Sequence, residues 1–236
     1  MNKVFSPFLD DSFKVPEEVP FFPLPEMALL PGEPMPLHIF EERYKVMTET
    51  ALVSDRMIVM GHVKQGWEKR PGSDRETYGI AGIGQIVMDE RLQDGRYNLV
   101  LLGLKRIKIN QVIPSKPFRK ARIEILDDQY SQTSSSLLES LEKEILELGN
   151  AVSRIKNNDA PVSLEGYPAL NNIAEGSLPL GALCDFTAAA LNLPSSDKQM
   201  ILDELDVVQR SEKLLFLLRY QLEFSKQPPA TAKYLN

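Results

Sequence analysis

Short apolar runs separated by turn residues mark the amino-terminal half of the chain, and they indicate strands. The predicted strands are Met57–Val63, Tyr78–Leu92, Tyr97–Gly103, Arg106–Ile113 and Arg119–Leu126. Several short strands at this spacing are typical of a small barrel or sandwich. Asp94 and Gly95 lie between two of them and predict a hairpin with a type I′ turn, which needs positive φ at both central residues. One helix is expected among the strands, from about Glu41 to Val53.

After Asp127 the pattern changes from strands to helices. A polar stretch at 129–136, QYSQTSSS, leads into a helix with apolar positions three and four residues apart. These positions are Leu141, Ile145, Leu148, Val152 and Ile155. Another helix is expected from Pro179 to Leu191, because proline suits a first helical turn and Pro194 prevents the helix from continuing.

Two capping boxes predict the last two helices. Ser196, with Gln199 three residues later, is expected to open a short helix, although Ser195 is an alternative cap. Asp206 and Gln209 repeat the arrangement before an apolar run that starts at Leu214. The carboxy-terminal half is therefore predicted to be a small helical bundle.

Composition is that of an ordinary globular protein. Of the 236 residues, 43% are hydrophobic and 25% are charged. No apolar run approaches the roughly 20 residues that cross a bilayer. The first residues carry acids where a secretory signal needs a basic start, so we expect a cytoplasmic protein. Cys184 is the only cysteine, which fits a reducing compartment.

The net charge of −6 hides one basic segment. Residues 95–123 contain eight Lys or Arg side chains and no Asp or Glu. The candidate basic patch consists of Arg96, Lys105, Arg106, Lys108, Arg119 and Lys120. A half-buried strand would turn several of these charges to solvent on one face.

The residues that could carry chemistry favour structural roles. The chain lacks the pattern G-x-x-x-x-G-K-[ST] that cradles nucleotide phosphates, so no nucleotide cofactor is expected. Cys184 lies on the apolar face of a predicted helix and should be a buried thiol. Ser211 and Lys213 are two residues apart on a helix and face different ways, so they form no dyad. His38 with Glu41 supplies too few ligands for zinc, and we expect no metal.

Three separated stretches resemble a single family. They are FFPLPEMALLPGEPMPLHIFEERY at 21–44, GRYNLVLLGLKRIKI at 95–109 and CDFTAAALNLPSSDKQMILDELDVVQRSEKLLFLL at 184–218. Each is similar to part of the amino-terminal domain of Lon proteases, the substrate-recognising module that also occurs as a stand-alone protein. The resemblance covers about Val19 to Phe224. Glu42 stands where many members have proline, a change that a first helical turn accepts.

The resemblance implies an α+β fold in which a PUA-like β-barrel precedes an α-helical bundle. The expected divisions are an amino-terminal arm at 1–18, the barrel at 19–126, a linker at 127–136, the bundle at 137–225 and a disordered tail at 226–236. His38, Glu41 and Arg43 belong to the family-like motif and are expected to be structural. Glu41 and Arg43 would anchor the helix to the barrel through hydrogen bonds or an ion pair.

The leading functional hypothesis is a non-enzymatic module that recognises exposed apolar segments of client polypeptides or of a partner, in protein quality control. Full-length Lon enzymes add an ATPase module and a Ser-Lys peptidase domain, and neither signature occurs in these residues. Binding is expected between barrel and bundle, or on the barrel face near Trp67, unless Trp67 folds back to close the barrel. Phe5, Phe8 and Phe13 are too apolar for a free tail and should pack on this subunit or on a neighbour. Candidate partners are thus apolar segments, a separate protease or chaperone, and a second copy.

Two other functions remain open on sequence grounds. PUA-like barrels of other families hold RNA, and the basic segment from Arg96 to Arg122 could contact phosphates. The acidic remainder opposes this, and no aromatic residue interleaves with Lys105, Arg106 and Lys108 to stack on bases. A hydrolase that works without ATP through Ser211 is the third hypothesis.

Overall fold

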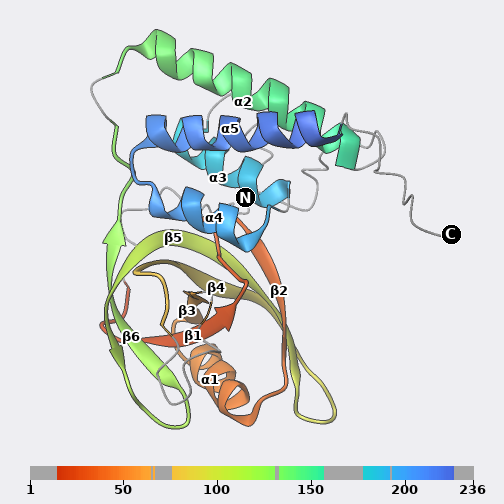
Figure 1. The fold of residues 1–236 in the computed structure, drawn as a ribbon. Coiled ribbons are helices and arrows are strands. Elements are labelled where there is room, and N and C mark those ends of the chain that lie inside the picture. The colour runs from red at the N-terminus through yellow and green to blue at the C-terminus, as the bar shows by residue number, and fades with distance from the viewer. Residues whose placement is uncertain are drawn as a thin grey trace, which may run out of the picture.

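The computed structural model describes residues 15–64, 66, 76–130, 133–156, 178–191 and 193–225. These residues contain six strands and five helices. The strands are β1 Val19–Pro25, β2 Pro34–Ile39, β3 Met57–Val63, β4 Ile80–Arg91, β5 Tyr97–Ile113 and β6 Arg119–Leu126. The helices are α1 Glu42–Leu52, α2 Ser135–Lys156, α3 Leu180–Ala190, α4 Ser195–Asp203 and α5 Val207–Ser225. The strand-rich half thus includes α1, and the remaining helices follow it (Figure 1). The expected α+β class is confirmed.

All six strands join one mixed sheet in the order β2-β5-β4-β3-β1-β6. β6 pairs with β5 as well as with β1, so the pairings from β5 through β4, β3, β1 and β6 return to β5 in a closed circuit. β1 and β3 run parallel, whereas the other pairs are antiparallel. β2 lies outside the circuit and pairs with the first half of β5. Among the described strands, β2 therefore has a free edge.

β5 is one continuous strand, so the prediction of two strands broken after Gly103 was wrong. Gly103 continues the ladder opposite Gly84 of β4. A Cβ atom at Gly103 would lie 2.0 Å from the carbonyl oxygen of Leu30. The glycine thus permits close approach of another backbone segment and does not mark a turn.

The hairpin between β4 and β5 is confirmed, but its predicted turn type was wrong. Gly95 has φ +83°, and among the described residues Asp94 is not one with positive φ. Gly95 N–H donates to the carbonyl of Leu92 at 2.9 Å, and Leu92 N–H donates to that of Arg96 at 2.8 Å. Only one left-handed residue is needed in such a loop, which typically joins a type I turn to a bulge.

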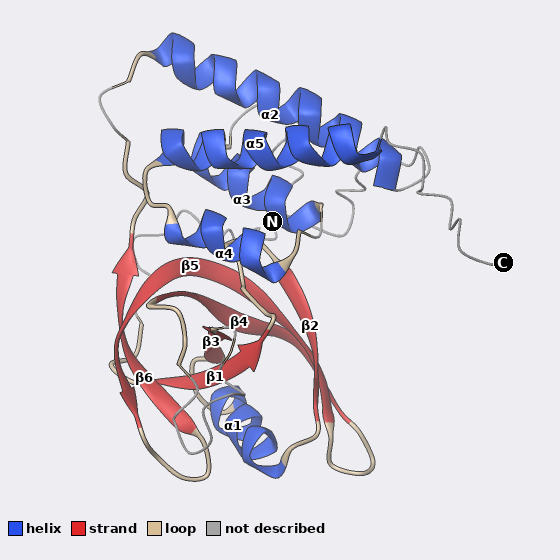
Figure 2. Ribbon diagram, viewed as in Figure 1, coloured by secondary structure: helices blue, strands red, loops and turns tan. Residues whose placement is uncertain are grey.

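The helices of the carboxy-terminal half are stacked over one side of the sheet. Figure 2 shows α4 nearest to β5, α3 and then α5 farther from the sheet, and α2 outermost, whereas α1 lies at the opposite end of the sheet. The bundle core contains Ile145, Leu183, Ile201, Leu214 and Leu218. A separate core between α1 and the strands contains Phe22, Met47, Ala51, Met60 and Leu101. No described helix is long and apolar enough to cross a membrane.

One of the two predicted capping boxes was wrong. Asp206 Oδ1 accepts from Gln209 N–H at 3.0 Å, as expected of a helix cap. α4 instead begins at Ser195 directly after Pro194, without a side-chain cap. Gln199 is buried and donates from Nε2 to the carbonyl of Ile80 at 3.0 Å. Its amide thus joins the helix to the sheet and leaves the helix end uncapped.

Candidate functional site

Three hollows in the surface meet at β2, and Pro36 lines all of them. The outer hollow, of about 400 Å³, is bounded by β2, β4 and β5. The side hollow, of about 260 Å³, is bounded by β1, β2 and the start of α1. The junction hollow, of about 390 Å³, lies between the segment 26–36 and the residues of α3 and α4. A surface with connected hollows along one edge strand is suited to holding an extended ligand.

The floor of the outer hollow is an apolar row across three strands. Pro36 of β2 lies opposite Val100 of β5, which in turn lies opposite Met88 of β4. Met88 keeps 66% of its surface exposed. Phe40, directly after β2, is 62% exposed and forms part of the side hollow. Exposed large apolar side chains beside hollows commonly mark interaction sites.

A polar row runs beside the apolar row. His38, Asn98 and Glu90 occupy the neighbouring register positions on β2, β5 and β4. Asn98 Nδ2 donates to Glu90 Oε2 at 3.3 Å, which leaves Asn98 Oδ1 to accept from His38 Nδ1 at 2.8 Å. His38 Nε2 then accepts from Arg96 Nη1 at 3.2 Å. These partners favour the tautomer in which Nδ1 of His38 carries the hydrogen.

The free edge of β2 offers acceptors but few donors. The carbonyl of Glu33 accepts from Gly103 N–H at 2.8 Å, so alternate residues from Glu33 onward face β5. The backbone groups of Pro34, Pro36 and His38 therefore point away from β5, toward the free edge. Of these three residues, only His38 has a backbone N–H group to offer there. An added strand could donate to this edge but would receive a single N–H in return. Side-chain contacts must therefore supply most of the affinity here.

The start of α1 forms the far wall of the side hollow. Glu41 Oε2 accepts from Arg43 Nη2 at 2.7 Å, so the two motif residues pair with each other, whereas the expectation was that they anchor the helix to the strands. The Arg43 guanidinium lies 4.4 Å from the ring centre of Tyr44, and Tyr44 packs against Phe22 of β1. Tyr44 therefore ties the helix to the strand, a contact that sequence reasoning missed.

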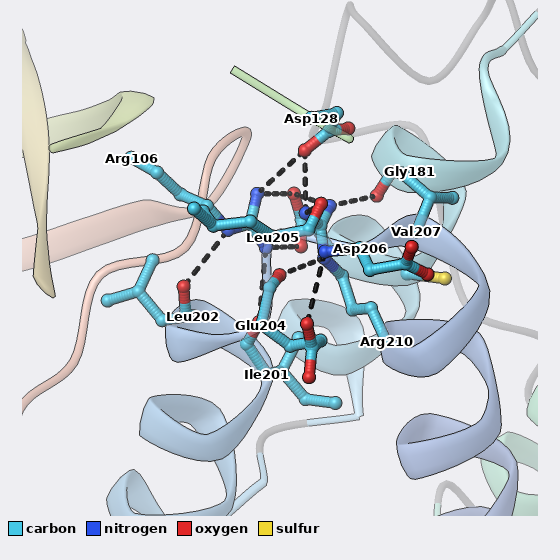
Figure 3. Close-up of polar contacts among 12 residues, drawn as sticks. Arg106, Asp128, Gly181, Ile201, Leu202, Glu204, Leu205, Asp206, Val207 and Arg210 are labelled. Carbon is cyan, nitrogen blue, oxygen red and sulfur yellow. Dashed lines mark hydrogen bonds and ion pairs between the residues drawn. The ribbon is translucent and has the colours of Figure 1, made fainter. Parts of the chain in front are cut away.

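The sheet and the bundle are joined by a network of charges in which only Asp128 among the four charged residues reaches the surface (Figure 3). Arg106 of β5 donates from Nη1 to Asp185 Oδ2 of α3 at 2.6 Å, and from Nε to the carbonyl of Leu202 at 3.1 Å. Arg210 of α5 donates to Asp128 Oδ1 at 2.6 Å and lies 3.7 Å from Asp185. Burial opposes the charge of Arg210, but Asp185 and Asp128 outweigh it and raise the pKa of the guanidinium. Two cations and two anions thus balance at the junction.

Two further polar contacts cross the same junction. Lys198 Nζ of α4 donates to Glu33 Oε1 at 2.5 Å, and Glu33 Oε2 accepts from Leu30 N–H at 3.0 Å. His62 of β3 is buried, with Nδ1 lying 3.1 Å from Gln199 Oε1. Glu33 and Lys198 also line the junction hollow, so a charged pair stands in the wall of the hollow between the two halves.

The candidate basic patch does not form one exposed surface. Arg106, a member of the predicted patch, is buried in the junction and is not available at the surface. Lys120 lies 3.4 Å from Glu18, and Arg96 lies 2.7 Å from Asp94. Lys105 and Arg119 are half-buried, whereas Lys108 is exposed. The segment presents fewer accessible charges than its count of Lys and Arg predicts.

The candidate nucleophiles lie inside the bundle. Cys184 is buried, as predicted, and its Sγ lies 3.2 Å from Ser211 Oγ. Burial raises the pKa of the Cys184 thiol to about 12, which keeps it protonated at neutral pH. Ser211 Oγ donates to the carbonyl of Val207 at 2.8 Å, whereas Lys213 binds Glu204 at 2.7 Å. Ser211 and Lys213 therefore bind different partners.

Several predicted residues lie outside the described part of the chain. They are Trp67 and the aromatic residues of the arm, Phe5, Phe8 and Phe13. Sequence reasoning missed Met88, Val100 and Glu90. The only signal for them was the alternation of side chains along β4 and β5, which shows which residues share a face but not which face is covered.

Comparison with known proteins identifies similar chains over most of this length. The family model of the ATP-dependent protease La (LON) substrate-binding domain matches residues 18–219. The Lon protease of Dictyoglomus thermophilum is 28% identical over 217 residues, which are 91% of this chain and 26% of that protein. Lon protease 2 of Myxococcus xanthus is 26% identical over 220 residues, or 93% of this chain and 26% of that protein. The chain spans about a quarter of the length of these relatives.

Two solved structures share the fold. The N-terminal domain of Mycobacterium avium complex Lon protease superposes with a TM-score of 0.59 at 17% identity, covering 86% of this chain and 98% of that one. A Lon N-terminal domain protein from Xanthomonas campestris gives a TM-score of 0.55 at 18% identity, covering 84% of this chain and 97% of that one.

Proposed function

The chain belongs to the family of the LON substrate-binding domain, and from that premise we propose that it binds exposed apolar segments of other polypeptides without cleaving them. The observation that carries the proposal is the apolar row Pro36, Val100 and Met88, which forms the floor of the outer hollow. Burial of a side chain as exposed as Met88 or Phe40 stabilises a complex by about 1–2 kcal/mol. Two or three such contacts would give the modest affinity that suits a module for many clients.

The mode of binding follows from the edge of β2. Pro34 and Pro36 supply no N–H groups, so a bound segment would gain little from joining the sheet as a further strand. Apolar side chains entering the outer and side hollows would instead provide the affinity. This mode tolerates many sequences, because it needs apolar side chains at intervals and no fixed hydrogen-bonding pattern.

The proposal also includes the type of fold and a role in the cell. The closed circuit of β5, β4, β3, β1 and β6 supports a PUA-like β-barrel. A role in protein quality control would follow, in which a separate protease or chaperone receives the bound segment. Trp67 and the aromatic residues of the arm remain candidate contacts to such a partner or to a second copy.

Titration of a chemically unfolded, alkylated model protein, followed by fluorescence anisotropy, tests the function. Met88→Ser and Phe40→Ser should each weaken binding about five- to tenfold, because each removes part of the buried apolar surface. Val53→Ser is the matched control, since Val53 is 87% exposed and lines none of the three hollows. Trp67→Ala tests the additional contact predicted from the sequence.

Two results would overturn the proposal. The first is an unfolded client that does not bind the wild-type chain, or that binds the Met88 and Phe40 variants as tightly as wild type. The second is cleavage of the client, seen as fragments on a gel after prolonged incubation with the pure protein.

A further inference from the structure

The charged residues that line the outer hollow all have the same sign. They are Asp89 and Glu90, and none of the described residues that line this hollow is a lysine or an arginine. Arg56 offsets Asp89, with Nη2 lying 2.5 Å from Asp89 Oδ1. Glu90 receives an amide N–H from Asn98 at 3.3 Å, a long and neutral contact for a carboxylate. The hollow therefore carries a negative charge that its own walls compensate only in part.

A bound apolar segment would draw Glu90 partly out of water. Loss of water raises the free energy of a charged carboxylate unless a hydrogen-bond donor or a cation takes the place of the water. Arg96 stands at the other end of the polar row, where it already binds Asp94 at 2.7 Å. A cation supplied by the ligand would therefore find Glu90 available, whereas an acid of the ligand at the same place would be repelled.

The register gives the spacing of such a ligand. Val100 belongs to the apolar row and Asn98 to the polar row, two residues apart on the same face of β5. The two rows are thus about 6.6–6.8 Å apart, which is also the separation of side chains i and i+2 in an extended peptide. A segment lying along β5 can therefore place one side chain over Met88 and Val100 while the side chain two positions away lies over Glu90.

We propose that the outer hollow selects extended segments in which an apolar residue is followed or preceded, two positions away, by lysine or arginine, with Glu90 as the residue that reads the charge. This inference rests on the proposed function and narrows it to a class of client. Segments with aspartate or glutamate at that position are disfavoured. The pairing is made by side chains, so it is compatible with the proline-blocked edge of β2.

Three synthetic peptides test the inference directly. They share one central leucine in a neutral, extended sequence and differ only two positions away, where they carry Lys, Gln or Glu. With the wild-type chain, the Lys peptide should bind about fivefold more tightly than the Glu peptide, with the Gln peptide between them. High salt should reduce that ratio, because the pair is partly exposed.

Glu90→Gln should bring the three dissociation constants to within about twofold of one another. Glu90→Lys should reverse the order, so that the Glu peptide binds best. Glu139→Gln is the matched control, since Glu139 is an exposed acid on α2, and it should leave the order unchanged. Circular dichroism checks that the variants are folded, which is expected because Glu90 is exposed.

The outcomes separate this inference from the proposed function. Equal affinities for the Lys and Glu peptides, or a preference that remains in Glu90→Gln, would overturn the inference that Glu90 selects a basic residue. Either result would leave the proposed binding of apolar segments intact. Failure of all three peptides and of the unfolded client to bind would overturn both.

Discussion

Replacement of Arg106 by methionine should destabilise the protein more than any exposed substitution, because it leaves a buried anion without its main partner. The side chains of Arg106 and Asp185 are each 3% exposed. The change removes the paired contacts to Asp185 and the hydrogen bonds to the carbonyls of Leu202 and Ile201. Asp185 would keep only the more distant Arg210, at 3.7 Å. Loss of one partner of a buried ion pair costs about 3–5 kcal/mol.

Urea unfolding followed by circular dichroism measures this loss of free energy. Lys108→Met provides the matched control, because it places the same side chain at an exposed position of β5 and should change stability by about 0.5 kcal/mol or less. The double variant Arg106→Met with Asp185→Leu should be more stable than Arg106→Met alone, since it removes the orphaned charge.

Two results would refute this reasoning. A loss below about 1 kcal/mol for Arg106→Met would mean that the junction is not desolvated in solution. Strictly additive losses in the double variant would mean that Arg106 and Asp185 do not interact.

Two further predictions concern the backbone contact at Gly103 and the buried thiol. Gly103→Ala should destabilise by about 2 kcal/mol or more in urea unfolding, because its Cβ would lie 2.0 Å from the carbonyl oxygen of Leu30; a change under about 0.5 kcal/mol would argue against that close approach. Cys184 should resist alkylation at pH 8 in the folded protein and react fully in urea, since burial raises the pKa of its thiol to about 12, and rapid native labelling would contradict this. The folded pKa exceeds the unfolded value of about 9, so Cys184 should lower stability as pH rises above about 9, and Cys184→Ala should remove that part of the alkaline slope.

Most of the helices and strands were predicted from patterns among residues that are close in the sequence. β3 and β6 have the bounds that alternation and turn residues gave, and α1 and α3 agree to within one residue at each end. These elements are delimited by local signals such as Pro194 and by apolar periodicity. β2 was not among the predicted strands, because Pro34 and Pro36 argue against a strand interior. Prolines fit in β2 only because their backbone nitrogens point to the free edge. Which edge is free depends on the strand with which β2 pairs.

The site was harder to predict, because its contacts join distant parts of the chain. Arg106 and Asp185 are 79 residues apart in the sequence. The number of lysines and arginines in residues 95–123 therefore could not show that Arg106 is buried. Met88 and Val100 resemble core residues in sequence, and only the sheet order leaves them uncovered. The resemblance to the Lon module gave the family correctly but carried no information about which strand is free.

The polar junction and the apolar surface are connected through the segment that precedes β2. Gly32, with φ +82°, lies so close to Phe186 of α3 that a Cβ atom would be 2.0 Å from its ring. Glu33, the next residue, binds Lys198 of α4 and the N–H of Leu30. Two helices of the bundle thus fix the residues from which β2 begins. Because β2 makes its ladder with β5 alone among the described strands, this clamp contributes much of what holds Pro36 and His38 in register. The bundle therefore acts as the support that keeps a nearly free edge strand in the position where the hollows form.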